Sequence, residues 1–172
     1  ATANTVDGTS NYAYAFGIEI DNSDASGGLD NSGTISATAS GNQDAGTVNA
    51  YGLFIDAAGD ISGGLDNSGT ISASATGGTT PSQAAIFIED SAISGGITNS
   101  GTIDGGTGFA IRMDNLQAAT TLTFTGGSVI GDVIDDTIAS GFSDTTIDGE
   151  ATIVADRKEL VRQILSQNND KK

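Results

Sequence analysis

The sequence predicts an all-β fold, a right-handed parallel β-helix, and three observations carry this prediction. The decapeptide GGLDNSGTIS at 27–36 recurs at 63–72, and a close variant, GGITNSGTID, follows at 95–104. A second motif runs in step with it, as GIEID, GLFID, AIFIE and AIRMD. Within both motifs aliphatic residues alternate with polar ones between Gly, Asn or Asp, which indicates short strands. Three short strands in about 25 residues are typical of one coil of a solenoid.

Each coil is expected to contain three strands. The first is GIEI, in which Ile18 and Ile20 should point inward and Glu19 outward. The second surrounds ISGGL, and the third is GTIS, in which Ile35 should be buried and Thr34 exposed. One coil buries too few aliphatic side chains to fold alone, so we expect stability to be cooperative along the stack.

The DNSG segment between the second and third strands predicts a corner, because Asn and Gly suit tight turns. Stacked corners should place Asn31, Asn67 and Asn99 in a ladder of amides. The glycines that follow them should stand where no Cβ fits. After residue 115 the repeat weakens, but LTFT, SVIGDV and TTIDGEATIV keep its alternation. We therefore expect about five to six coils, a rod of roughly 25–30 Å at one strand spacing per coil.

Two insertions lengthen the repeat directly after the third strand. They occupy 37–51 and 73–84, whereas the third copy has only GGTGF at this point. We expect loops over 37–50 and 73–83, side by side on adjacent coils. Loops on a rigid scaffold are common recognition sites, although this Ala-, Ser-, Thr- and Gly-rich composition also fits an idle spacer.

The composition changes at Asp156, which divides the chain into a β-helix at 1–155 and a tail at 156–172. The tail holds five of the six basic residues and no glycine. Its apolar residues have helical spacing, and Asp156 with Glu159 fits a capping box. A helix that caps the last coil is the preferred interpretation. An amphipathic helix that docks on a partner or on another copy, or a linker, remains an alternative.

Charge and composition exclude several classes of function. The net charge is −16, from 22 acids and 6 bases, which argues against nucleic acid and anionic membrane surfaces as partners. The chain contains no Cys and no His, so thiolate metal sites, disulfides and His-dependent nucleophilic catalysis are excluded within it. No apolar run approaches the ~20 residues of a membrane-spanning helix.

Acidic residues suggest two weak site hypotheses. Asp132, Asp135 and Asp136 in GDVIDD could act as paired carboxylates in glycoside hydrolysis. Solvated acids at a corner explain them better, so we predict no enzyme and no catalytic residue. Weak Ca²⁺ binding by oxygen ligands is conceivable in the acidic turns, but no resident cofactor or metal site is predicted. These turns contain Asp21, Asp24, Asp30 and Asp66.

A third hypothesis concerns hydroxyl groups. Thr34, Thr70 and Thr102 should form one outward column, and TLTFT adds further threonines. A flat array of hydroxyls is what an ice-binding solenoid presents. However, Asp104 interrupts the neighbouring serine column, and Thr is an ordinary occupant of exposed strand positions.

The residues ISGGITNSGTIDGGTGFAI, with their earlier copies and LTFTGGSVIGDVI downstream, resemble the passenger region of bacterial autotransporters. The resemblance covers about residues 11–154 and implies a β-helix that is secreted or displayed on the bacterial surface. Adhesion and aggregation are common roles in that family, although a shared fold does not establish a function.

We therefore expect a non-catalytic structural or adhesive segment, with a cell-surface or glycan ligand and with self-association through coil ends or the C-terminal helix. A self-assembling fibre or scaffold subunit is one alternative. An ice-binding or polysaccharide-acting β-helix is another.

Overall fold

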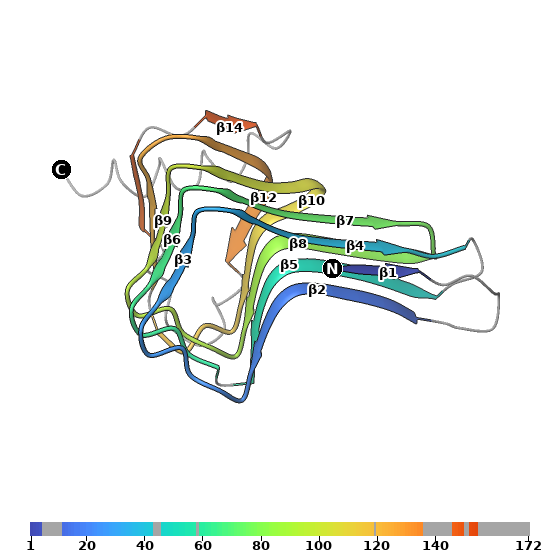
Figure 1. Cartoon of the computed structure of the whole chain (residues 1–172), viewed down its shortest axis with the longest axis horizontal. Coiled ribbons are helices and arrows are strands. Elements are labelled where there is room, and N and C mark those ends of the chain that lie inside the picture. Colours follow the sequence, from blue (N-terminus) through green and yellow to red (C-terminus); the bar gives the residue numbers. More distant parts are fainter. Residues whose placement is uncertain are drawn as a thin grey trace.

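The computed structural model describes residues 1–4, 12–42, 46–57, 59–118, 120–135, 146–149 and 152–154. All regular structure in these residues is β-strand, and every strand pair among them is parallel, as the sequence predicts (Figure 1). The described residues contain no helix, and the capping helix predicted for 156–172 lies outside them.

The strands form two sheets. The nine-stranded sheet follows the order β1 (Thr2–Asn4), β4 (Thr34–Ser40), β7 (Thr70–Thr76), β10 (Thr102–Asp114), β8 (Thr80–Glu89), β5 (Thr47–Asp56) and β2 (Tyr12–Asp21), with β12 (Ser128–Asp135) beside β10 and β14 (Thr152–Val154) beside β12. The five-stranded sheet follows the order β13 (Thr146–Gly149), β11 (Thr121–Phe124), β9 (Ile97–Asn99), β6 (Leu65–Asn67) and β3 (Leu29–Asn31).

Each passage of the chain through these strands stacks on the passage before it. Leu29 pairs with Leu65 and Ile35 with Ile71, so equivalent residues of successive repeats are direct neighbours. The strands are parallel and the sheet is nearly closed, which is consistent with a solenoid-like fold. It explains the repeated decapeptide, because every passage needs the same strand and the same corner.

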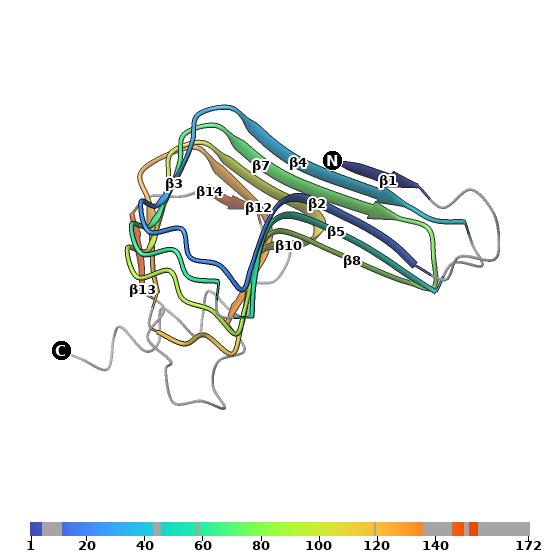
Figure 2. The same cartoon turned by 60° about the horizontal axis from the view of Figure 1, so that its bottom comes forward.

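The two sheets enclose a space, which we call the body (Figure 2). Aliphatic side chains fill it. Leu53, Ile55, Ile61, Leu65 and Ile71 of one passage are fully buried. Their equivalents in the first passage are only partly buried. The alternation predicted for GIEI and GTIS is confirmed, and the interior thins toward the first passage.

The predicted ladder of asparagines is present. The Asn31 amide donates to Asn67 Oδ1 at 2.7 Å, and the Asn67 amide donates to Asn99 Oδ1 at 2.7 Å. All three side chains are buried. A Cβ on Gly69 would lie 2.0 Å from the Gly33 carbonyl oxygen and one on Gly101 would lie 2.1 Å from the Gly69 carbonyl oxygen, so the predicted exclusion of a Cβ is confirmed at these two corners. It is wrong for Gly33 in the first passage, where a Cβ would meet no atom within 4 Å.

The prediction of loops over 37–50 and 73–83 is wrong, because the described residues of both insertions are mostly strand. β4 continues to Ser40 and β5 begins at Thr47, while β7 continues to Thr76 and β8 begins at Thr80. The layer of β1, β4 and β7 packs on the outer parts of β2, β5 and β8. Together they form a two-layered projection from the body, which we call the wing (Figures 1 and 2).

Small side chains fill the wing and explain its thinness. ATAS and ASAT alternate Ala with Ser or Thr, so one face of each strand carries only methyl groups. Two such faces can pack closely in the manner of a dry zipper. The buried set consists of Ala13, Ala15, Ala37, Ala39, Val48, Ala50 and Ala73.

Glycine marks the point where the strands pass from body to wing. Gly52 interrupts the alternation of β5, and a Cβ there would lie 2.6 Å from the Ala85 carbonyl oxygen and 2.9 Å from the Ser72 carbonyl oxygen. The two layers therefore converge at this corner only because residue 52 has no side chain. Gly17 has the same role in β2, where a Cβ would lie 2.4 Å from the Gly52 carbonyl oxygen.

Candidate functional site

The most distinctive surface is the side of β2, β5 and β8 that faces away from the alanine interior. In β2, Ala13 and Ala15 point into the wing, so Tyr12, Tyr14 and Phe16 point outward. The chain has three tyrosines and six phenylalanines, and seven of these nine meet here. We call this surface the aromatic face; its rings belong to Tyr12, Tyr14, Phe16, Tyr51, Phe54, Phe87 and Phe109.

The rings form one continuous row. The ring centroids of Tyr12 and Tyr14 are 6.1 Å apart with planes at 18°, and those of Tyr14 and Phe16 are 6.4 Å apart at 9°. The Phe16 ring lies 5.4 Å from the Phe54 ring, which lies 5.2 Å from the Phe87 ring. The row runs from the wing into the body, and offset stacking of this kind stabilises each ring on the next.

The two ends of the row differ in exposure. Tyr12 is 61% and Tyr14 46% exposed, and they are the exposed large hydrophobic side chains of the described residues. Tyr51, Phe54 and Phe87 are each less than 10% exposed. The wing thus presents two open rings, while the body end of the row is covered.

Arg112 covers that body end. Its guanidinium lies 4.7 Å from the centre of the Phe87 ring and 5.5 Å from that of Phe109. It also pairs with Asp114 at 2.5 Å. The one basic side chain of residues 1–155 is therefore held by cation–π and ionic contacts inside the protein.

Acidic side chains stack where these strands end. Asp21 pairs in register with Asp56, and Glu89 pairs with Asp114. Burial raises the pKa of the Glu89 carboxyl, and the negative charges of its acidic neighbours raise it further, while Arg112 opposes the shift. The stack is thus a place of mutual repulsion among carboxylates.

The residues considered for Ca²⁺ do not gather at one point. Asp21 lies in the acidic stack, Asp24 accepts the Asp60 N–H at 3.3 Å, and Asp30 pairs in register with Asp66. Among the described residues, no group of three or more acidic side chains is placed to hold a metal ion.

Polar groups border the open rings. Asn49 of β5 is the register partner of Tyr14, and Ser82 of β8 is in turn the register partner of Asn49. Asn49 Oδ1 is buried and has no hydrogen-bond partner among the residues that the structure describes. Burial raises the pKa of the Tyr51 hydroxyl, and a hydrogen bond with Ser82 opposes the shift. The alternation YAYAF could have revealed the exposed rings in the sequence, but their polar neighbours come from other passages.

The opposite side of the wing is a face of hydroxyl groups. Thr34, Thr70 and Thr102 stack as predicted, and Ser128 continues their column. The wing adds further columns, in which Ser40 Oγ lies 3.2 Å from Thr76 Oγ1. Asp104 pairs with Ser72 and interrupts its column, as the sequence indicates.

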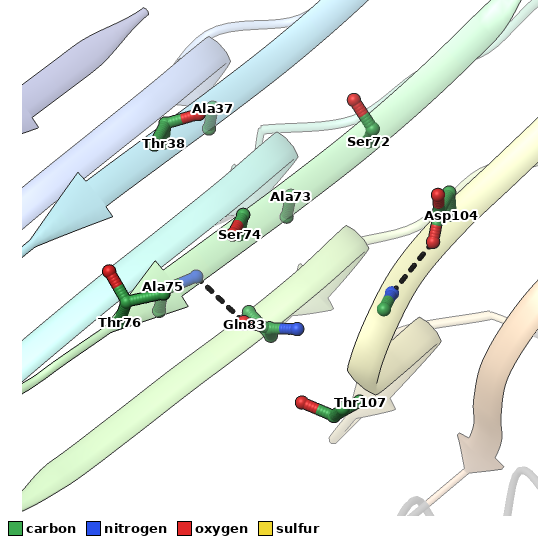
Figure 3. Close-up of a pocket in the computed structure, with 11 residues that line it drawn as sticks. Ala37, Thr38, Ser72, Ala73, Ser74, Ala75, Thr76, Gln83, Asp104 and Thr107 are labelled. Carbon is green, nitrogen blue, oxygen red and sulfur yellow. Dashed lines mark hydrogen bonds between the residues drawn. The ribbon is translucent and has the colours of Figure 1, made fainter.

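The wing stops at β7 and β8, because the next passage has no insertion. On the side away from β4 and β5, no described strand pairs with 73–76 or 80–83. The Gln83 side chain closes this edge, since its Oε1 accepts the Ala75 N–H at 2.6 Å and its Nε2 donates to the Gly105 carbonyl at 2.6 Å. A shallow hollow of about 480 Å³ borders this contact (Figure 3).

Proline reinforces the closed edge. Pro81 is in register with Val48, and Gln83 is in register with Ala50. Pro81 has no N–H to offer another strand. The last strand pair of the wing, β7 and β8, thus carries a Pro and a Gln where the pair before it has Val48 and Ala50. Such residues protect a sheet edge against pairing with another strand.

The carboxylates considered for catalysis lie on and after β12. Asp132 is in register with Phe109. The side chain of Asp135 and all of Asp136 lie outside the described part of the chain.

Comparisons of the chain with protein-family models, with curated protein sequences and with solved structures find no match. In the part of the chain that the structure describes, no helix could cross a membrane.

Proposed function

We propose that the chain is a right-handed parallel β-helix of about five to six coils and serves as a non-catalytic structural and adhesive segment. In this proposal it is secreted or displayed on a bacterial surface, like the autotransporter passengers that its sequence resembles. The wing is its binding element, and the body is the rod that carries the wing.

The wing supports this proposal because it is an ordered surface that the stacking of the body does not require. The third repeat has no wing and still pairs in register with its neighbours, so the wing is not required for stacking. Its alanine interior is buried, and its two sides differ in chemistry, one aromatic and one rich in hydroxyls. A preformed surface binds without the entropic cost of ordering loops.

A variant without the wing tests the proposal. Residues 1–15 are removed and residues 37–50 and 73–83 are each replaced by the GGTG link (105–108) of the third repeat, which keeps the register of the body. Beads coated with either protein are then applied to a panel of epithelial and bacterial cells. We expect retention of the variant beads to fall at least tenfold. Circular dichroism and thermal unfolding identify variants in which the body has folded. Equal retention of a folded wingless variant would overturn the proposal.

A second candidate is assembly through coil ends, favoured by the burial gradient in the body. Ile18, Ile20 and Leu29 of the first passage are partly exposed, whereas Leu53, Ile55 and other later equivalents are fully buried. An apolar end of this kind could stack on a second copy. Sedimentation velocity over a hundredfold concentration range tests this candidate, with Leu29→Lys as the interrupted variant. A monomer at every concentration would eliminate it.

A further inference from the structure

We propose that the exposed end of the aromatic face binds an uncharged oligosaccharide chain, with Tyr12 and Tyr14 as its stacking surface. This inference rests on the proposed function, in which the wing is the binding element, and it names the ligand. Three independent features of the described residues support it: the geometry of the rings, an unpaired polar atom and the distribution of charge.

The ring geometry fits a flat, repeating ligand. Tyr12, Tyr14 and Phe16 follow one another along a single strand at 6.1 and 6.4 Å, with planes within 18° and 9° of each other. The negative face of an aromatic ring attracts the weakly positive C–H groups on one side of a sugar ring. The exposed parts of the Tyr12 and Tyr14 rings could therefore each carry one sugar of an extended chain.

A buried acceptor lies beside these rings. Asn49 is the register partner of Tyr14, and no described residue forms a hydrogen bond with its Oδ1. An unpaired buried acceptor costs about 1–3 kcal/mol. Asn49 as a whole is partly exposed, so a turn of its side chain would bring this oxygen to a sugar hydroxyl, which is a donor, and remove that cost while the Tyr14 ring stays in place. A few such polar groups within an apolar surface fix a ligand's orientation.

Charge selects an uncharged ligand. The net charge of −16 repels polyanions, and Arg112 is already paired with Asp114. A cationic ligand would favour the acidic stack, but the open rings lie at the other end of β2 from Asp21. The ring surfaces near that stack, on Phe87 and Phe109, already carry Arg112. Among the described residues, the register partners of Tyr12 and Tyr14 are the uncharged Thr47 and Asn49.

The wing holds the two tyrosines in place. Ala13 and Ala15, the residues between the three outward rings, are 4% and 3% exposed and are locked in the alanine interior. The backbone under the rings is therefore fixed before the ligand arrives, which lowers the entropic cost of binding.

Titration with soluble hexasaccharides tests the inference directly on the full chain. Cellohexaose, chitohexaose and maltohexaose are followed by tyrosine fluorescence, since the chain has three tyrosines and no tryptophan, and by calorimetry. We expect at least one to bind, with Tyr14→Ala weakening it at least tenfold and Tyr12→Ala severalfold. Tyr14→Phe should bind within twofold of the parent, because stacking needs the ring and not the hydroxyl.

Two variants complete the design. Asn49→Leu should weaken binding severalfold, while Thr38→Ala, on the hydroxyl side of the same wing, should leave it unchanged. The inference is overturned if none of the three hexasaccharides binds, if Tyr14→Ala binds as tightly as the parent, or if a sulfated oligosaccharide binds more tightly than the neutral ones.

The bead assay separates this inference from the proposed function. Loss of retention in the wingless variant, combined with full retention of Tyr14→Ala beads on periodate-treated cells, would leave the wing as the binding element and refute the glycan. Full retention of the wingless variant would refute the proposed function itself.

Discussion

The body and the wing are built on the same strands but are filled differently. β5 passes through both: its inner residues in the body are Leu53 and Ile55, and those in the wing are Val48 and Ala50. The register with β8 continues across the boundary, and only Gly52 marks the change. Side-chain size thus decides whether the two layers lie apart and enclose a body, or lie close and form a wing.

The comparison also indicates which of the two regions contributes more to stability. Burial of large aliphatic side chains contributes most of the hydrophobic stabilisation, and these side chains are in the body. The alanine interior contributes less per residue but brings two ordered surfaces close to each other. We therefore expect substitutions in the body to unfold the protein and substitutions in the wing to act locally.

The largest effect is expected for Ile86→Ala in the body. Ile86 is fully buried, and its truncation should leave a cavity and lower the free energy of unfolding by about 2–5 kcal/mol. Urea unfolding followed by circular dichroism measures this. Thr38→Ala, a solvent-facing change, is the control. A loss below 1 kcal/mol would show that the body is not the main source of stability.

The next effect is expected for Ala39→Leu in the wing. Ala39 is fully buried between the two layers, so a larger side chain should force them apart at a cost of about 1–3 kcal/mol. Hydrogen exchange should accelerate in 37–40 and 47–50 and stay slow around Ile71. Thr38→Leu, on the solvent-facing side of the same strand, is the control for added bulk. Uniform acceleration throughout the protein would contradict the local role of the wing.

A smaller effect on stability, but a visible one on association, is expected for Gln83→Ala. The change frees the Ala75 N–H and uncovers the last row of the wing, at a cost of about 0.5–1.5 kcal/mol. An open strand edge invites pairing with another copy. Light scattering should detect dimers or larger species, more so in Gln83→Ala combined with Pro81→Thr. Monomers in both variants would show that the edge needs no protection.

The smallest effect is expected for Glu89→Gln in the acidic stack. Because the pKa of folded Glu89 is raised above 4.5, its ionised form opposes folding at neutral pH, and this opposition disappears as the pH falls through the raised pKa. Glu89→Gln should therefore have a higher Tm at pH 7, with the difference vanishing near pH 4. The opposite pH dependence would mean that Glu89 is stabilised by Arg112 instead.

Sequence reasoning recovered the body because its signals have high contrast. Ile35 and Ile71 alternate with Thr and Ser, and Asn31 and Asn67 recur at fixed places, so both their burial and their stacking could be predicted. The wing escaped because Ala alternating with Thr or Ser in ATAS differs little in hydropathy and suggests a loop. The aromatic face depends on register: Phe16 meets Phe54 only because β2 and β5 pair as they do. Asn49 beside Tyr14 arises in the same way.

The closed edge at Gln83 limits which insertions and deletions the chain can accept during evolution. The passages that form the wing leave and re-enter the body at the same corner, so a wing strand pair can be gained or lost by one in-frame insertion or deletion. A single new pair, however, would have an unprotected edge unless it carried its own Pro and Gln. Strand pairs should therefore be added to a wing next to existing pairs, while the pair that carries the Pro and Gln remains the last one. The surface of the wing then grows by duplication, while the passage that carries Pro81 and Gln83 stays at the end.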